Sequence, residues 1–162
     1  MIEVKPEPLT EESFAPFGQV IEPNTAKFFM INEGTTERHH ALSKVELDEG
    51  SVILSIFRGR SRPRPLELKL VERHPLGSQA FVPLQAEPWL VVVASEPKPE
   101  AVRCFLAQGN QGVQYSKGVW HHPLLPLVSK QGFLIVDREG PGKNLEEVHW
   151  DEGVRILSLI HI

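Results

Sequence analysis

Short apolar runs alternate along this chain with breaks that contain proline or glycine. Six runs have the branched or alternating composition that is typical of β-strands, and three more show it weakly. The clear runs are Ser51–Phe57, Leu66–Val71, Trp89–Ala94, Ala101–Leu106, Phe133–Val136 and Val154–Ile160, and the weaker ones are Gln19–Glu22, Phe28–Ile31 and Gln79–Pro83. Most intervals between runs are too short for the helical crossovers that parallel strands require. The pattern therefore predicts a mostly β protein, built as an antiparallel sandwich or barrel.

One segment near the start of the chain has the pattern of a helix N-terminus, Thr10-Glu11-Glu12-Ser13-Phe14. Thr10 can accept hydrogen bonds from the free N–H groups of a first turn, and the two glutamates complement the positive end of a helix. Pro16 and Gly18 follow at once. We therefore expect one short N-terminal helix.

Composition narrows the class of protein. The chain has 162 residues, of which 41% are hydrophobic and 23% charged, so we expect one globular domain over residues 1–162. The net charge of −4 argues against nucleic acid as a partner. No apolar run approaches the roughly 18 residues of a membrane span. The one cysteine, Cys104, lies in an apolar run, which predicts a core position, no internal disulfide and a cytoplasmic location.

Candidate chemistry comes from the histidines, seven in all, and from two segments with a recognisable spacing. In the first, Glu72-x-His74-(x)4-Gln79, residues two apart on a strand share a face, so Glu72 and His74 are expected to point into one barrel mouth. The turn Pro75-Leu76-Gly77 returns Gln79 on the next strand. This segment is similar to the first metal motif of cupins, small double-stranded β-helix proteins, with Glu in place of the first His and Gln in place of the acid.

The second segment is Ser116-Lys117-Gly118-Val119-Trp120-His121. It resembles the second cupin motif, Pro-x-Gly-x-x-His, with Ser in place of Pro. Gly118 permits a tight turn that would deliver His121 to the same mouth. A pair of neutral imidazoles with a Glu or Gln oxygen suits a divalent metal ion, and His74, Gln79 and His121 are the candidate ligands. The alternative is a degenerate cupin in which the histidines only satisfy polar positions.

Longer strings give a more specific resemblance. Arg73-His74-Pro75-Leu76-Gly77-Ser78-Gln79-Ala80-Phe81 and Gly118-Val119-Trp120-His121-His122-Pro123-Leu124 closely resemble the ureidoglycolate lyase family. That resemblance implies a cupin-type double-stranded β-helix (an antiparallel β-barrel or jelly roll), a homodimer, and a carbon–nitrogen lyase of the amidine-lyase type. The expected reaction is cleavage of (S)-ureidoglycolate to glyoxylate and urea in allantoin, and hence purine, degradation. A divalent metal, Ni²⁺ in particular, is also implied.

Such a cleavage removes the hydroxyl proton of the substrate, breaks a C–N bond and protonates the departing nitrogen. His74 and His121 are candidates for this acid–base work, because the unperturbed pKa of imidazole lies near neutral pH. If they instead hold a metal, Glu72 becomes the better base. The residues themselves leave both schemes open.

Four further residues are candidates for binding the substrate. Arg38 offers a fork of donors for the carboxylate, whereas Arg73 should face away from the cavity that its neighbours share. Asn32 could bind the ureido group through its amide. Gln79 and Tyr115 could add an amide and a hydroxyl to the pocket.

His149 and His161, without convergent polar neighbours in sequence, are expected on the surface or in packing roles.

Two other functions compete with the lyase. The first is an amidohydrolase that acts on the same substrate and releases ammonia. The second is a non-catalytic cupin that binds a small anion as a sensor or as a sugar-binding module. A pure binding site has less need for two imidazoles and a carboxylate together, so an enzyme is favoured.

Overall fold

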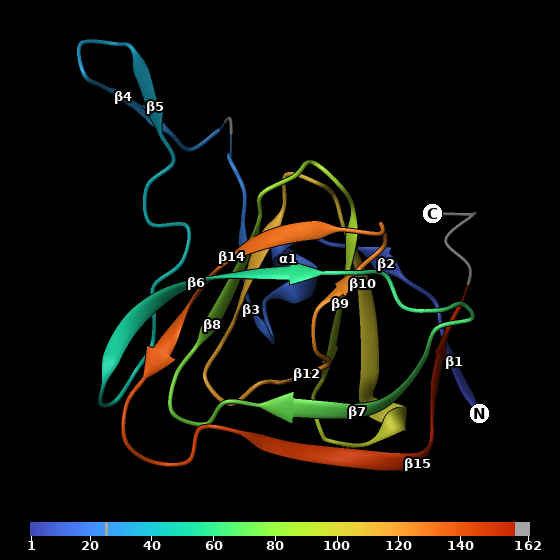
Figure 1. The fold of residues 1–162 in the computed structure, drawn as a ribbon. Helices are drawn as coiled ribbons and strands as arrows, with labels where there is room; N and C mark the ends of the chain where they lie inside the picture. Colours follow the sequence, from blue (N-terminus) through green and yellow to red (C-terminus); the bar gives the residue numbers. More distant parts are fainter. Residues whose placement is uncertain (25, 158–162) are drawn as a thin grey trace.

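Two β-sheets form most of the protein in a computed structural model that describes residues 1–24 and 26–157. The larger sheet has eight strands, the smaller five, and a separate two-stranded hairpin projects from them (Figure 1). The predicted helix is present as α1 (Glu11–Phe14), capped by Thr10, whose side chain accepts from the Ser13 backbone N–H at 3.0 Å. The prediction of a mostly β, cupin-like fold with one short helix is confirmed.

Most strands of the larger sheet are antiparallel, but β1 and β2 join it in parallel to β15 and β10. In spatial order it contains β1 (Ile2–Val4), β15 (Glu146–Ile156), β7 (Glu67–Arg73), β12 (Trp120–His121), β9 (Trp89–Ala94), β10 (Val102–Ala107) and β2 (Glu7–Pro8), while β13 (Leu125–Pro126) pairs with β9. A short 3₁₀ turn, Pro99–Ala101, precedes β10.

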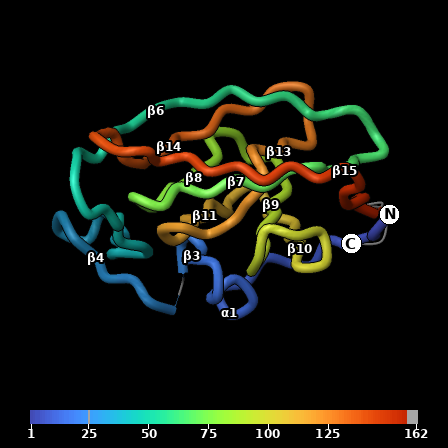
Figure 2. The backbone as a smooth tube through the Cα atoms, turned by 90° about the horizontal axis from the view of Figure 1, so that it is seen from below, coloured from blue at the N-terminus to red at the C-terminus, as the bar shows by residue number. Residues whose placement is uncertain are grey.

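The smaller sheet contains, in spatial order, β3 (Gly18–Ile21), β11 (Gly112–Tyr115), β8 (Gln79–Pro83), β14 (Gln131–Glu139) and β6 (Ser51–Gly59). The hairpin is formed by β4 (Phe29–Ile31) and β5 (Thr36–Arg38). Seen from below, the larger sheet curls beside the smaller one (Figure 2).

Two apolar cores hold this arrangement together. The first lies between the sheets, where Trp89, Val91 and Phe105 of the larger sheet meet Phe133 and Ile135 of the smaller. The second lies inside the curl of the larger sheet and consists almost entirely of its own residues. It includes Leu68, Val71, Val92, Cys104 and Val154. Cys104 is fully buried as a free thiol, as predicted.

The strand predictions differ from the structure mainly in short elements. All nine predicted runs overlap observed strands, but β1, β2, β5, β11, β12 and β13 were not predicted. Each has four residues or fewer, so it shows no clear alternation of apolar and polar residues in the sequence. The run Val154–Ile160 begins as the end of β15, and its last three residues, like His161, lie outside the described residues.

Candidate active site

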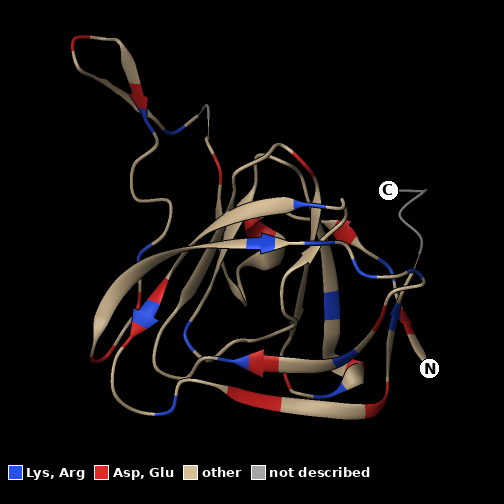
Figure 3. Ribbon diagram, viewed as in Figure 1, with Lys and Arg blue, Asp and Glu red and all other residues tan. Residues whose placement is uncertain are grey.

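An open cavity of about 1170 Å³ is lined by residues of both sheets. Its walls come from the C-terminal ends of β6, β7 and β14, the start of β8, the segment that leads into β15 and the start of β15. The chain positions involved are Phe57, Glu72, His74, Gln79, Phe81, Asp137, Arg138, Lys143, Asn144, Leu145, Glu146, Glu147 and His149. Bands of acidic residues mark these strand ends near the lower left of the charge-coloured view (Figure 3).

Strand register builds the centre of the site. Glu72 in β7 is directly opposite His121 in β12 and Glu147 in β15, so the three side chains share one face of three adjacent strands. His121 Nε2 lies 3.8 Å from the Glu72 carboxylate. The prediction that Glu72 and His74 share one cavity is confirmed, because both line it.

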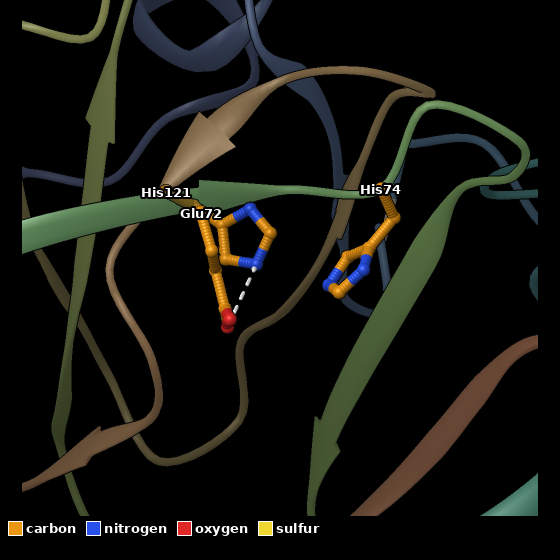
Figure 4. Close-up of side chains that lie close together, drawn as sticks. All are labelled: Glu72, His74 and His121. Carbon is orange, nitrogen blue, oxygen red and sulfur yellow. Dashed lines mark ion pairs between the residues drawn. The ribbon is translucent and has the colours of Figure 1, made fainter. Parts of the chain in front are cut away.

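The two histidines also converge as predicted. Their ring centroids are 5.2 Å apart, and ligand atoms of Glu72, His74 and His121 all lie within 4.8 Å of one another. Figure 4 shows the His74 ring turned toward the other two side chains. Gly118 makes this possible: it has a φ of +80°, and its N–H donates to the His74 carbonyl at 3.0 Å, which ties the turn before His121 to His74.

Hydrogen bonds to backbone carbonyls set the tautomer of both imidazoles. His74 Nδ1 lies 2.9 Å from the Asn144 carbonyl, and His121 Nδ1 lies 3.0 Å from the Val119 carbonyl. A carbonyl only accepts, so each Nδ1 carries a proton, and in the neutral form of each ring it is Nε2 that presents a lone pair. Both Nε2 atoms are buried and have no hydrogen-bond partner in the described part of the chain.

Gln79 supplies a third unpaired acceptor. Its Nε2 donates to Asp137 at 3.1 Å, which leaves Oε1 buried and without a partner among the described residues. Gln79 is directly opposite Tyr115 in β11, whose ring stacks on His121. The amide therefore belongs to the same face of the barrel as the histidines.

Burial shifts the pKa values of His121, Glu72 and Asp137. Desolvation lowers the pKa of His121 to about 3, against the smaller opposing effect of its hydrogen bond to Val119, so the ring stays neutral. Burial also raises the pKa of the Glu72 carboxyl; nearby His74 opposes this shift and Glu147 adds to it. The pKa of Asp137 is raised by burial, partly offset by the hydrogen bond from Gln79 and by His74.

Three predicted substrate-binding residues do not line this cavity. Tyr115 is only 4% exposed and lies beneath His121, because its strand directs the ring into the core between the sheets. Arg38 and Asn32 lie on the exposed β4–β5 hairpin, which carries them away from the cavity of their own chain (Figure 1). The sequence showed that Arg38 adjoins His39 and His40, but those two also lie outside the cavity wall.

The remaining predictions about nearby residues can be placed as well. Arg73 faces away, as expected: its guanidinium lies 4.6 Å from the centre of the Trp120 ring and pairs with Glu146. His149 lies on the surface, as expected, and is placed at the rim of the cavity, 3.8 Å from Glu147.

Sequence reasoning missed Asp137 and Glu147. Asp137 carried a usable signal, since it continues the alternation of Phe133 and Ile135, two core residues on the same strand face. A charged residue in that register points toward the interior and so toward a site. Glu147 carried no comparable signal, because its place depends on pairing with β7, a strand distant in the sequence.

Comparison with known proteins decides the family. The family model described as ureidoglycolate lyase matches residues 1–157. The chain belongs to the ureidoglycolate lyase family. It is 55% identical over 150 residues to ureidoglycolate lyase 1 of Rhizobium meliloti, an alignment that covers 90% of this chain and 88% of the relative. It is 51% identical to the ureidoglycolate lyase of Azotobacter vinelandii, covering 93% of this chain and 94% of that protein.

Members of this family are enzymes by name, and the cluster at the cavity has the character of an enzyme site. Two buried imidazole Nε2 atoms, the Glu72 carboxyl group with its raised pKa and the buried Gln79 amide oxygen lie in or directly behind the wall of an open cavity. Within the described residues, no helix is both long and apolar enough to cross a membrane.

Proposed function

We propose that this protein is a ureidoglycolate lyase that cleaves (S)-ureidoglycolate to glyoxylate and urea. The observation that carries this proposal is the convergence of Glu72, His74 and His121 at the cavity of a chain in this family. The substrate bears a carboxylate and a hydroxyl on the carbon that holds the urea nitrogen, and its cleavage needs a base next to that hydroxyl.

The acceptor atoms at the site fit a divalent metal ion. His74 Nε2, His121 Nε2 and Gln79 Oε1 are buried lone-pair donors without a hydrogen-bond partner in the described chain, and burying such atoms unpaired is costly. A positive ion bound at this site would supply the partner that such lone pairs lack, and imidazole nitrogen with amide oxygen suits a metal such as Ni²⁺. These three residues would hold it, with the Glu72 carboxylate alongside. When bound, the ion would polarise the carboxylate and hydroxyl of the substrate and lower the hydroxyl pKa.

Glu72 is the proposed base. Its carboxylate lines the cavity, and its raised pKa makes it a stronger proton acceptor than an exposed glutamate. Glu72 takes the hydroxyl proton as the C–O bond becomes the aldehyde of glyoxylate and the C–N bond breaks. The same proton is then returned to the departing nitrogen to give urea. One carboxyl group therefore serves first as the base and then as the acid, and no net proton is gained or lost.

His74 and His121 act as lone-pair donors through Nε2 in this scheme. The pKa of His121 is far too low for it to hold a proton at neutral pH, which speaks against the acid–base alternative for that residue. Asp137 orients Gln79 by accepting from its amide nitrogen, so that the amide oxygen is left for the site. For the carboxylate and ureido groups of the substrate, Arg38 and Asn32 remain our proposed partners.

Turnover of racemic ureidoglycolate tests this function, with urea, glyoxylate and ammonia quantified separately. Equimolar urea and glyoxylate are expected, and the activity should fall after treatment with a chelator and return with a divalent metal. Ammonia without urea would identify an amidohydrolase instead. Binding without turnover, before and after metal is added, would indicate a non-catalytic anion-binding protein.

We also propose that residues 1–162 form one domain, that the protein acts in allantoin and purine degradation, and that it works as a cytoplasmic homodimer. The free buried Cys104 supports a reducing compartment. An exposed aliphatic face on the edge strand β6 supports the dimer. A sedimentation mass of a single chain, 18.2 kDa, at micromolar concentration would contradict it.

A further inference from the structure

The β4–β5 hairpin forms a sheet of its own and pairs with neither of the two larger sheets of the described chain. It projects from the two sheets (Figures 1 and 2). Within the described residues, the side-chain hydrogen bonds and aromatic contacts of positions 28–38 all stay within positions 24–40. A two-stranded hairpin is marginally stable alone, so this one is expected to pack against another surface.

Its side chains point to an apolar partner. Phe28, Phe29 and Met30 are 37%, 50% and 48% exposed. Such a run of large exposed apolar residues marks a contact surface in a soluble protein. We therefore expect another surface to cover this hairpin, which we call the arm (residues 28–38).

A second exposed apolar surface lies on the body of the protein. Val52, Leu54 and Ile56 on the outward face of β6 are 47%, 70% and 63% exposed, and Leu84 nearby is 50% exposed. β6 is also the edge strand of its sheet. Two copies related by a two-fold axis can cover both surfaces at once, because each copy gives an arm and receives one.

The cavity itself lacks a suitable partner for an anionic substrate. Four carboxylates line it, from Glu72, Asp137, Glu146 and Glu147, against the two cations Arg138 and Lys143. The Arg138 guanidinium already donates to the carbonyls of Glu49 and Pro141. Lys143 is an exposed single charge at the rim. A carboxylate is bound best by a fork of donors, which neither cation offers freely.

The arm carries the missing group. Arg38 is exposed, forms no ion pair among the described residues, and has its guanidinium 5.9 Å from the centre of the Phe29 ring. Asn32, Glu33 and Gly34 at the tip all have positive φ values, of 52°, 60° and 84°, so the tip adopts an unusual turn. The Asn32 side chain there is exposed, and its Nδ2 donates to Thr36 Oγ1 at 3.5 Å.

We propose that the β4–β5 hairpin of one copy completes the cavity of a second copy, where Arg38 binds the carboxylate of the substrate and Asn32 its ureido group. This inference rests on the proposed function and adds that each active site is shared between two chains. The cation of Arg38 complements the carboxylates of the cavity, and in this proposal neither chain alone holds a complete site.

A heterodimer of two inactive variants tests this arrangement. Arg38→Gln and Glu72→Gln are each expected to abolish most activity, through KM and kcat respectively. A doubly tagged heterodimer with one variant in each chain has one site with both defects and one site with neither. It should therefore recover about half of the wild-type activity, as two-fold symmetry requires. A heterodimer as inactive as its parents would overturn the proposal.

Two matched variants sharpen the result. Arg60→Gln removes an exposed arginine that lies outside the cavity, and Lys143→Gln removes the rim cation; both should leave KM within about two-fold of wild type, the range expected for an exposed charge. If Lys143→Gln raised KM strongly while Arg38→Gln did not, the carboxylate partner would be Lys143 and the proposal would fail.

One measurement is independent of turnover. Ile56→Asp should convert the dimer to a monomer in sedimentation, and amide hydrogen exchange over residues 29–38 should be much faster in that variant than in the wild type. Equal exchange rates would mean that the arm is uncovered, which would contradict the shared site even if the protein proved inactive on ureidoglycolate. Wild-type turnover without complementation would contradict only the shared site.

Discussion

Tyr115 lies flat against His121, with ring centroids 4.2 Å apart and ring planes only 11° apart. The tyrosine is buried beneath the histidine, on the side away from the cavity. Its ring therefore holds the imidazole in place, together with the hydrogen bond from His121 Nδ1 to Val119. The residue that was expected to offer a hydroxyl to the substrate instead positions a neighbour.

Replacing Tyr115 separates these two roles. Tyr115→Phe keeps the stacked ring and should retain near-wild-type kcat and KM. Tyr115→Leu removes it, and metal affinity should fall by roughly 10- to 100-fold, as for other residues that orient a ligand. The measurement is metal affinity by calorimetry beside steady-state kinetics. A large loss of activity in Tyr115→Phe would restore the hydroxyl to the substrate pocket.

Substitutions at Glu72 and His74 distinguish the base from a ligand. In Glu72→Gln the shape of the side chain persists but its basicity is lost, so kcat should fall by roughly 10²- to 10⁴-fold while metal is retained. His74→Ala removes a lone-pair donor, so bound metal itself should be lost. Metal content by elemental analysis, measured with kcat, checks both.

Other metal contents in these two variants would change the roles assigned to Glu72 and His74. Loss of metal from Glu72→Gln would make the carboxylate a ligand, in keeping with its distance from the two imidazoles. Full metal content in His74→Ala would remove that histidine from the ligand set. Thermal unfolding of each variant provides the control for folding.

Gly118→Ala probes the turn that brings His121 to His74. Nothing lies within 4 Å of a Cβ at this position, so the cost comes from the φ of +80° alone. The free energy of unfolding should fall by about 1–2 kcal/mol, because an L-residue with a side chain disfavours the left-handed region. Chemical denaturation measures this loss.

A matched substitution controls for the side chain. Gly118→Asn should lose less stability than the alanine variant, since asparagine tolerates the left-handed conformation better. Equal losses in the two variants would show that crowding, and not backbone conformation, governs the position.

Cys104 predicts a dependence of stability on alkaline pH. Burial, with a smaller contribution from Glu7, raises the pKa of its thiol from 9.0 to about 12. The unfolded chain releases this proton first, so the contribution of the thiol to stability is complete below about pH 9 and is lost as pH rises toward 12. Denaturation of wild type and Cys104→Ala at several pH values isolates the effect.

The expected result is a wild-type stability that falls relative to Cys104→Ala above pH 9. The native thiol should also resist alkylating reagents at pH 8.5, where an exposed thiol reacts readily. Parallel pH profiles for the two proteins would contradict the pKa shift.

The local spacing of residues was a good guide wherever a site is built from one strand and its following turn. Glu72 and His74 share a face, and Gln79 returns on the next strand, as the sequence indicated. That reasoning could not place Arg38 or Tyr115. Whether a side chain faces the cavity, the core or solvent depends on which strands become neighbours, and neighbours in this fold are distant in the sequence.

The alternation of apolar and polar residues, the turn residues and the two histidine motifs were enough to determine the main strands, the short helix and the chemistry that the site employs. The tertiary structure alone decided that Asp137 and Glu147 join the site, that Tyr115 supports His121, and that Arg38 stands on a projecting hairpin. The physical reason is that side-chain periodicity is local, whereas the register between β7, β12 and β15 arises from the packing of the whole sheet.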